Sequence, residues 1–303
     1  MKIEEEGRME TAFEELRSSG ERAVHAGQLE IAEAFFRQAV EWAGQHGEQW
    51  QVDLGVCNRA AVAIELGHGE GEVPRLREIL VRNLDPLTCQ LAAYNISRYY
   101  ELTKNYKKSL FYARIALDRA GILGRREWLA SSHNLIGNTL LAESFIEGAC
   151  AEYENALELI SPEPSAARGQ ILDNLGYCRI LQGRYDEGYR LLYESLRLLQ
   201  RFGARRYEIS VRLDLCFAHL ETGRYRLSRR QGTAALALAE SVGERDSIKN
   251  ALYLLGEVAN LSGNSEMARG YFGRLHLEFF PEAGYLPEFL LAVDIRKLVN
   301  LHA

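Results

Sequence analysis

The stretch that decides the fold is LGYCRILQGRYDEG, from Leu175 to Gly188. It contains an apolar–glycine pair, Leu175-Gly176, and a second glycine seven residues later, Gly183. Two acidic residues, Asp186 and Glu187, stand three and four positions after that glycine, and acids in the first turn of a helix are stabilised by the helix dipole. The stretch therefore predicts a helix, a tight turn and the start of a second helix.

The same arrangement recurs along the chain. Apolar–glycine pairs recur at Ile136-Gly137 and Leu255-Gly256, and the turn position recurs at Gly27, Gly67, Lys104, Ser144, Gly183, Gly223 and Gly263. Successive turn positions are separated by 40, 37, 40, 39, 40 and 40 residues. A fixed period of this size indicates one supersecondary unit copied along the chain and stacked into a solenoid. Solenoids typically present a continuous concave surface, so the pattern points away from an enzyme.

Small residues occupy a fixed slot seven positions before each turn. They are Gly20, Ala60, Ser97, Gly137, Gly176, Cys216 and Gly256. Compact and aromatic residues follow each turn at helical spacing, for example Ala32, Phe36 and Ala39 after Gly27. Small residues are expected where the two helices of a hairpin approach closely, and aromatic residues where neighbouring hairpins pack.

This pattern resembles the tetratricopeptide repeat, from about Glu14 to Leu275. The match is specific at Gly27, Ser144, Gly183 and Gly263, looser at Gly223, and poor around Gly67. The period is about 40 residues instead of about 34, so longer helices are expected. Long-helix repeats of this kind resemble those of kinesin light chains, of Rap-type bacterial peptide sensors and of some transcription-activator domains.

The expected fold class is all-α, a right-handed tetratricopeptide-like solenoid of about seven helical hairpins in a single domain over residues 1–303. The repeats are expected at about 8–46, 48–84, 87–122, 126–161, 164–202, 205–242 and 244–279. Terminal repeats need a cover for their exposed apolar edge. Apolar residues recur at helical spacing after Pro287, which predicts a capping helix over 286–302.

Composition agrees with a globular chain. Hydrophobic residues make up 47% and charged residues 26%, with a net charge of −6. No apolar run approaches the about 20 residues that span a bilayer, and the charged start, Met1 to Glu6, is unlike a signal peptide. The expected location is cytoplasmic, without a membrane partner, and the five cysteines are expected to be buried free thiols.

No motif for catalysis or cofactor binding stands in the sequence. It contains no P-loop, no G-x-G-x-x-G and no G-x-S-x-G, and no histidine lies at metal-ligand spacing from a cysteine or carboxylate. We expect no enzyme activity, no cofactor and no metal.

The resemblance implies which positions line the concave groove of the first helices: those two, three and six residues before the small slot, and the one after it. We take the following as candidate binding residues: Asn58, Tyr94, Asn95, Arg98, Asn134, Asn138, Asp173, Asn174, Tyr177, Asp214, Phe217, Asn250 and Tyr253. An asparagine amide can pair with both the N–H and the C=O of an extended peptide. The alternative is that these asparagines face water or join adjacent repeats.

A second candidate surface is rich in arginine. Nine arginines lie between Arg197 and Arg230, against three acidic residues. Its proposed members are Arg205, Arg206, Arg224, Arg226, Arg229 and Arg230. Arginine suits bidentate contact with carboxylate or phosphate. In a chain that is acidic overall, an acidic protein partner or a solvated surface is favoured over nucleic acid.

The sequence thus predicts a non-catalytic scaffold or adaptor that binds a protein or peptide segment in its groove. One alternative is a peptide-responsive sensor that controls a partner protein. Another is an enzyme or an RNA-associated factor. The sequence leaves open the ligand, the pathway, homo-oligomer formation, and which of the two surfaces is the main interface.

Overall fold

The structure is a computed structural model that describes residues 2–82, 84–296, 299 and 301. Helices joined by short turns make up this part of the chain, which contains no strand. The chain divides into two compact units, Met1–Glu143 (unit 1) and Ser144–Ala303 (unit 2). The all-α class predicted by the periodicity is confirmed, whereas the joining of all repeats into one domain stays a prediction.

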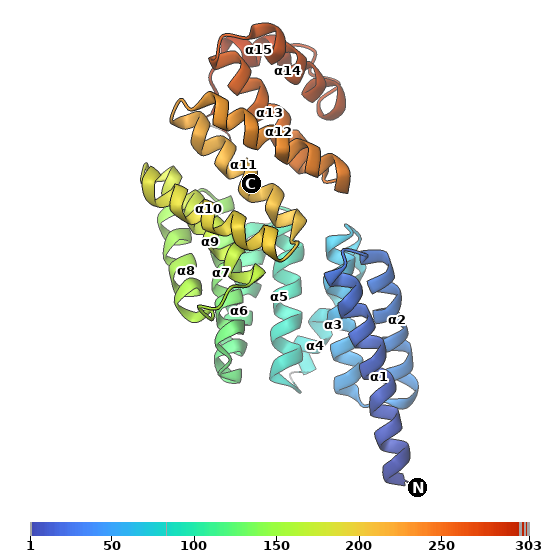
Figure 1. Ribbon diagram of the computed structural model, residues 1–303. Coiled ribbons are helices and arrows are strands. Elements are labelled where there is room, and N and C mark those ends of the chain that lie inside the picture. The colour runs from blue at the N-terminus through green and yellow to red at the C-terminus, as the bar shows by residue number, and fades with distance from the viewer. Residues whose placement is uncertain (1, 83, 297–298, 300, 302–303) are drawn as a thin grey trace. The chain divides into compact units, whose positions relative to one another are not determined.

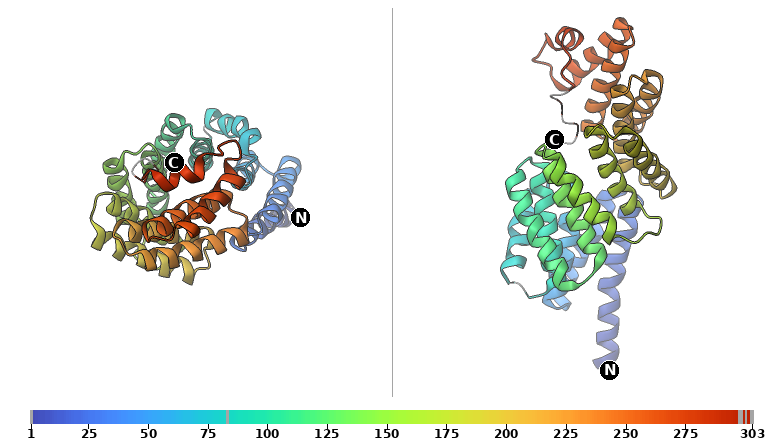
Figure 2. Two further views of the ribbon diagram at one scale, coloured as in Figure 1. Left: turned by 90° about the horizontal axis from the view of Figure 1, so that it is seen from above. Right: turned by 90° about the vertical axis from the view of Figure 1, so that its left-hand side faces the viewer.

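Unit 1 contains the helices α1 to α7 (Figure 1). Their bounds are α1 Lys2–His25, α2 Leu29–His46, α3 Gln49–Glu65, α4 Val73–Arg82, α5 Pro86–Leu102, α6 Tyr106–Leu123 and α7 Arg126–Ala142, with a 3-10 turn, η1, over Gly69–Glu72. The first helices of successive hairpins, α1, α3, α5 and α7, contact one another in that order. The start of α1 extends beyond the helices that pack against it (Figure 2).

Unit 2 contains the helices α8 to α15. Their bounds are α8 Ile146–Leu159, α9 Ala166–Leu181, α10 Tyr185–Arg201, α11 Arg205–Glu221, α12 Tyr225–Val242, α13 Arg245–Leu261, α14 Ser265–Phe279 and α15 Leu286–Ala292. Helix α11 contacts both α9 and α13, and we call these three helices the first-helix layer of unit 2. Helices α10, α12 and α14 pack against their respective partners in this layer.

The turn positions found in the sequence share one backbone conformation. All seven have a positive φ: 73° at Gly27, 85° at Gly67, 58° at Lys104, 61° at Ser144, 74° at Gly183, 68° at Gly223 and 82° at Gly263. Among the described residues, Lys104 and Ser144 are the only non-glycine residues with a positive φ. The left-handed conformation ends one helix and turns the chain into the next. The sequence period therefore marks the geometry of the hairpin turn.

The small slot before each turn is a point of close helix approach. A Cβ at Gly256 would lie 2.2 Å from Cε1 of Phe272, and a Cβ at Gly20 would lie 2.5 Å from Cε1 of Phe36. Phe272 is fully buried and Phe36 is 3% exposed. The glycine of the first helix thus makes room for the aromatic ring of the second, which explains why the two residue types recur together.

The repeat around Gly67 departs from the others, as its poor match to the pattern indicates. Its second helix, α4, has 10 residues and is preceded by the 3-10 turn η1. Pro74 lies in the first turn of α4, where the missing backbone N–H costs no helical hydrogen bond.

The C-terminal helix is shorter than the 286–302 that the apolar spacing predicts. Helix α15 ends at Ala292, and Val293 adopts an extended conformation with φ −125° and ψ 120°. The Asp294 carboxylate then accepts a hydrogen bond from the backbone N–H of Arg296 at 3.0 Å. Such local side-chain bonds compete with helix formation. Residues 297, 298, 300, 302 and 303 of the expected helix lie outside the described residues.

The five cysteines are buried and free, as expected. No helix among the described residues combines the length and the apolar character needed to cross a bilayer.

Candidate functional site

Seven of the predicted binding residues belong to unit 2, and all seven lie on the first-helix layer. They are Asp173, Asn174 and Tyr177 on α9, Asp214 and Phe217 on α11, and Asn250 and Tyr253 on α13. The rings of Tyr177 and Phe217 contact each other across α9 and α11, with centroids 5.7 Å apart. The repeat spacing therefore selects positions from three neighbouring helices of one layer.

Two carboxylates are buried close together in this layer. Asp173 is 3% exposed and Asp214 is 1% exposed. Burial raises the pKa of Asp173 well above its ordinary value, the charge of Asp214 raises it further, and a hydrogen bond with Ser210 acts in the opposite direction. The Oδ1 atom of Asp173 has no hydrogen-bond partner among the described residues. Repulsion between buried carboxylates favours keeping a proton on one of them.

A third buried acid lies on α13. Glu257 is 2% exposed, and its Oε1 atom has no hydrogen-bond partner within the described part of the chain. Burial, together with the charge of Asp294, raises the pKa of Glu257 to about 7, although Arg296 acts in the opposite direction. The hydroxyl of Tyr253, one turn earlier, is also buried without a described partner.

Glu257 was not among the predicted binding residues, although the sequence carried a signal for it. It occupies the position after the small slot, as Tyr177 and Phe217 do in the two preceding first helices. Glu221, near the C-terminal end of α11, carries no comparable signal, because its role depends on a partner 75 residues away, Arg296.

The chain's own C-terminal segment contacts this layer. We use that name for the described residues after α15, which are Val293 to Arg296, Val299 and Leu301. The amide of Asn250 donates to the carbonyl oxygen of Leu301 at 3.2 Å. The phenol of Tyr177 also has a hydrogen bond with the backbone of Leu301. Leu301 is thus held through its backbone by side chains from α13 and α9.

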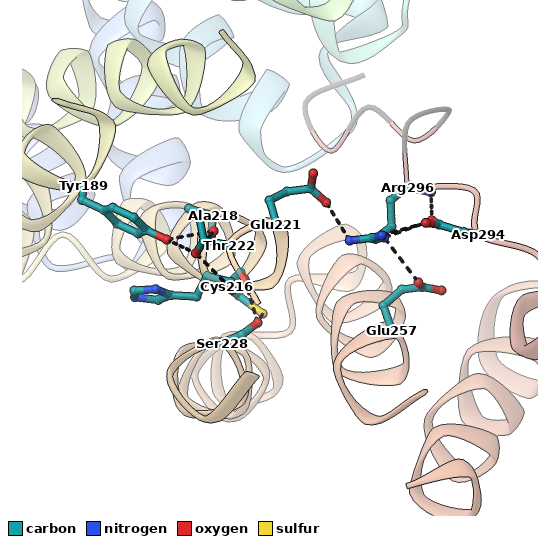
Figure 3. A network of polar contacts seen from close by, with 10 residues as sticks. Tyr189, Cys216, Ala218, Glu221, Thr222, Ser228, Glu257, Asp294 and Arg296 are labelled. Atoms are coloured by element: carbon teal, nitrogen blue, oxygen red, sulfur yellow. Dashed lines mark hydrogen bonds and ion pairs between the residues drawn. The ribbon is translucent and has the colours of Figure 1, made fainter. Parts of the chain in front are cut away.

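Arg296 is the charged contact of the C-terminal segment. Its Nη1 atom lies 2.9 Å from Oε1 of Glu221, and its Nε atom lies 3.9 Å from Oε2 of Glu257. Its Nη2 atom also lies 2.7 Å from Oδ2 of Asp294 in the same segment. Figure 3 shows Glu221 and Glu257 reaching this guanidinium from two helices of the layer. One arginine therefore meets three carboxylates.

A ring cluster of Tyr189, Tyr193 and His219 joins α10 to α11, and Figure 3 shows the Tyr189 hydroxyl beside Ala218 of α11. The Tyr189 hydroxyl donates to the carbonyl oxygen of Ala218 at 2.8 Å. The Tyr193 hydroxyl lies 2.9 Å from Nε2 of His219, whose ring stacks on Tyr189 with centroids 4.8 Å apart. Burial lowers the pKa of His219 to about 4, helped by the charges of Arg224 and Arg230. The cluster holds adjacent hairpins together with a neutral imidazole.

The remaining predicted binding residues lie in unit 1, on α3, α5 and α7. Asn95 is buried, and its amide donates to the carbonyl oxygen of Cys57 at 2.8 Å. Arg98 forms ion pairs with Glu65 at 2.9 Å and with Glu101 at 2.8 Å. Asn95 thus joins adjacent repeats instead of facing water, and Arg98 is paired with glutamates of its own unit.

The other four predicted residues of unit 1 are partly exposed. Asn58, on α3, has a buried amide nitrogen without a hydrogen-bond partner among the described residues. Tyr94, Asn134 and Asn138 are half-buried and make contacts within the protein. These residues are therefore available in part to a ligand.

The arginine-rich surface lies at the starts of α11 and α12. Its six predicted members, Arg205, Arg206, Arg224, Arg226, Arg229 and Arg230, are all exposed. A surface hollow is lined by Arg226, Arg229 and Arg230 together with apolar residues of α12. Arg206 is paired with Glu244 at 3.0 Å, and Arg224 lies over the ring of Tyr189, 4.9 Å from its centroid. The surface is cationic, and two of its members already have partners.

Comparison of the sequence with family models and with curated proteins finds no match. Solved structures do align. A Rap protein complexed with competence and sporulation factor aligns with a TM-score of 0.70 at 15% identity, over 91% of this chain and 75% of that chain. The apo form of RapI aligns with a TM-score of 0.64 at 13% identity, over 88% and 97%.

A tetratricopeptide repeat protein from Parabacteroides merdae aligns with a TM-score of 0.51 at 16% identity, over 93% of this chain and 98% of that chain. At such identities the likeness concerns the fold. The helix pairs, the left-handed turns and the small-residue slots agree with it. The chain therefore has the fold of the tetratricopeptide-type helical repeat proteins.

Proposed function

We propose that this protein binds an extended peptide segment of a partner on the first-helix layer of unit 2, without catalysis. The observation that carries the proposal is that the backbone of Leu301 has two hydrogen bonds, one with Asn250 and one with Tyr177. Side chains that pair with backbone groups hold a peptide largely independently of its sequence. The Tyr177–Phe217 pair supplies apolar contacts beside them.

The alignment with a Rap protein supports this choice, because that protein, which has a similar fold, is complexed with competence and sporulation factor. A finer form of the proposal is a sensor, in which peptide binding changes the affinity for a second protein. Rap-like architecture favours this form over a passive scaffold. The sensor form predicts that adding the peptide shifts the affinity for that second protein, and by linkage that the second protein shifts the affinity for the peptide by the same factor.

The test is selection from a displayed library of random nine-residue peptides. Peptides enriched on the full chain should lose affinity for the Asn250→Ala variant, by about 0.5–1.5 kcal/mol for one neutral hydrogen bond. Lys249→Ala is the matched control, because Lys249 precedes Asn250 on α13 and pairs with Asp246. Failure to enrich any peptide, or equal binding by Asn250→Ala, would contradict the proposal.

The arginine-rich surface is a separate candidate contact for an acidic protein. Because Arg226, Arg229 and Arg230 are exposed around one hollow, charge reversal should weaken retention on a polyglutamate resin in a salt-dependent manner. Equal retention of the wild-type and reversed chains would leave this surface as a solvated face. Retention on nucleic acid, or turnover of an added phosphoprotein, would favour the RNA-associated or enzymatic alternatives instead.

A further inference from the structure

The contacts of the C-terminal segment reach all three helices of the first-helix layer. Leu301 contacts α9 through Tyr177 and α13 through Asn250, while Arg296 contacts α11 through Glu221. An extended ligand would make this combination of backbone and charged contacts. The segment therefore stands where the proposed function places a peptide.

The charges around Arg296 are unbalanced. Three carboxylates surround one guanidinium, and the Glu221 and Asp294 contacts are at hydrogen-bond distance. The contact with Glu257 is not, because the two nearest atoms are 3.9 Å apart. Glu257 is nevertheless buried, with an Oε1 atom that has no hydrogen-bond partner among the described residues. A buried carboxylate without a close cation is costly, so Arg296 is an incomplete partner for this acid.

We propose that the C-terminal segment is a built-in occupant of the first-helix layer, and that the peptide that displaces it carries an arginine or lysine side chain reaching Glu221 and Glu257. This inference rests on the proposed function. It adds a ligand class, an extended peptide with a basic side chain, and a competition between that ligand and the chain's own C-terminal segment.

One feature favours displacement and one opposes it. A cation that reaches Glu257 at hydrogen-bond distance gains an interaction that Arg296 lacks, and charge-assisted bonds are about twice as strong as neutral ones. The occupant, however, is tethered to α15, so a competing peptide must overcome its high effective concentration. The apparent affinity of the peptide then equals its intrinsic affinity multiplied by the fraction of time that the layer is uncovered.

The test uses the full chain and a fluorescent peptide with the sequence of residues 293–303, VDIRKLVNLHA. In the Arg296→Glu chain, the tethered segment is repelled by Glu221 and Glu257 and should be released. This chain should bind the peptide about tenfold or more tightly than the wild-type chain, which corresponds to coverage for at least about nine-tenths of the time. Arg190→Glu, an equal charge change at an exposed position of α10, should leave the affinity unchanged.

A second measurement reports the segment itself. Hydrogen exchange, followed by mass spectrometry on the C-terminal peptide, should be slow in the wild-type chain and fast in the Arg296→Glu and Arg296→Gln chains. Unchanged exchange in both variants, or equal peptide affinity for the wild-type and Arg296→Glu chains, would overturn the built-in occupant. Neither result would affect the proposed function, provided that library peptides still bind.

The ligand class has its own control. A peptide in which the arginine of VDIRKLVNLHA is replaced by glutamate should not bind the Arg296→Glu chain. Binding of both peptides with equal affinity would overturn the requirement for a basic side chain. Release of the segment without binding of any peptide, selected or synthetic, would instead overturn the proposed function.

Discussion

The amide nitrogen of Asn95 in α5 lies 2.8 Å from the carbonyl oxygen of Cys57 in α3, and the bond between them joins the first helices of two successive hairpins. Both residues are buried, at 5% and 1% exposure. The carbonyl oxygen of Cys57 therefore has this contact in place of water. An asparagine at a repeat position can thus belong to the interior of the protein and not to its ligand surface.

Replacement of Asn95 by alanine should lower the stability of unit 1. The substitution removes one partner of a buried hydrogen bond, which costs about 1–3 kcal/mol. Urea unfolding of the Asn95→Ala chain checks this value. Asn250→Ala is the comparison, because its amide bonds a carbonyl of the C-terminal segment and its side chain is only half-buried. A smaller loss in Asn95→Ala than in Asn250→Ala would argue against the joining role.

The stability of the chain should depend on the protonation of Glu257. Its pKa in the folded chain is about 7, above the ordinary value of 4.5, so the folded state binds this proton more tightly than the unfolded state. The contribution of Glu257 is therefore favourable below about pH 4.5 and is lost as the pH rises to about 7. Asp173, with its raised pKa, acts in the same direction.

The Glu257→Gln chain isolates this effect. Glutamine resembles the protonated acid, so the difference in Tm between the variant and the wild-type chain should be small near pH 5. The variant should become the more stable chain at pH 8. Thermal unfolding across this range gives the measurement, and a difference that does not change with pH would show that Glu257 titrates normally.

His219 should stay neutral at physiological pH. Its pKa is lowered to about 4, first by burial and then by Arg224 and Arg230. Because the folded pKa lies below the ordinary value of 6.5, its contribution to stability is present above about pH 6.5 and is lost as the pH falls to about 4. The imidazole resonances of His219 in NMR spectra should not shift between pH 8 and pH 5.5. Replacement of Arg230 by glutamine should raise the pKa of His219. A midpoint near 6.5 in the wild-type chain would contradict the buried, uncharged ring.

Gly183 and Gly270 should respond in opposite ways to alanine. Gly183 has a φ of 74°, where a Cβ costs roughly 1–2 kcal/mol, so Gly183→Ala should destabilise unit 2 by about that amount. Gly270 lies within α14 with no atom near its Cβ position, and Gly270→Ala should stabilise the helix by up to about 1 kcal/mol. Chemical denaturation of the two variants compares them. Equal effects would mean that the turn does not require the left-handed conformation.

The hairpins could be predicted from the sequence because their determinants are local. The left-handed turn falls at every one of the seven positions, including Lys104 and Ser144, where no glycine marks it. The small slots follow from helix contact within one hairpin, as at Gly256 and Phe272. Such short-range requirements leave a repeated trace in the chain.

The site was predictable only in part, because its decisive contacts are not local. Spacing selected Tyr177, Asn250 and Tyr253, yet it could not show that Leu301 lies against two of them. The end of α15 was missed because the apolar period continues past Ala292, whereas the Asp294 carboxylate bonds the following backbone and competes with the helix. Asn95 and Asn250 occupy related helix positions, and only packing separates their roles.

Each unit contains buried cysteines whose alkylation can be used to measure local unfolding of that unit. Cys57 and Cys89 lie in unit 1, and Cys150, Cys178 and Cys216 lie in unit 2. Burial raises the pKa of Cys57 and raises that of Cys216 to about 12, so these thiols are poor nucleophiles in the closed protein. An alkylating reagent reacts when local unfolding exposes the sulfur atom, and the labelling rate then measures the free energy of that opening. The labelling rates of the native cysteines therefore measure local unfolding in each unit separately, without any engineered residue.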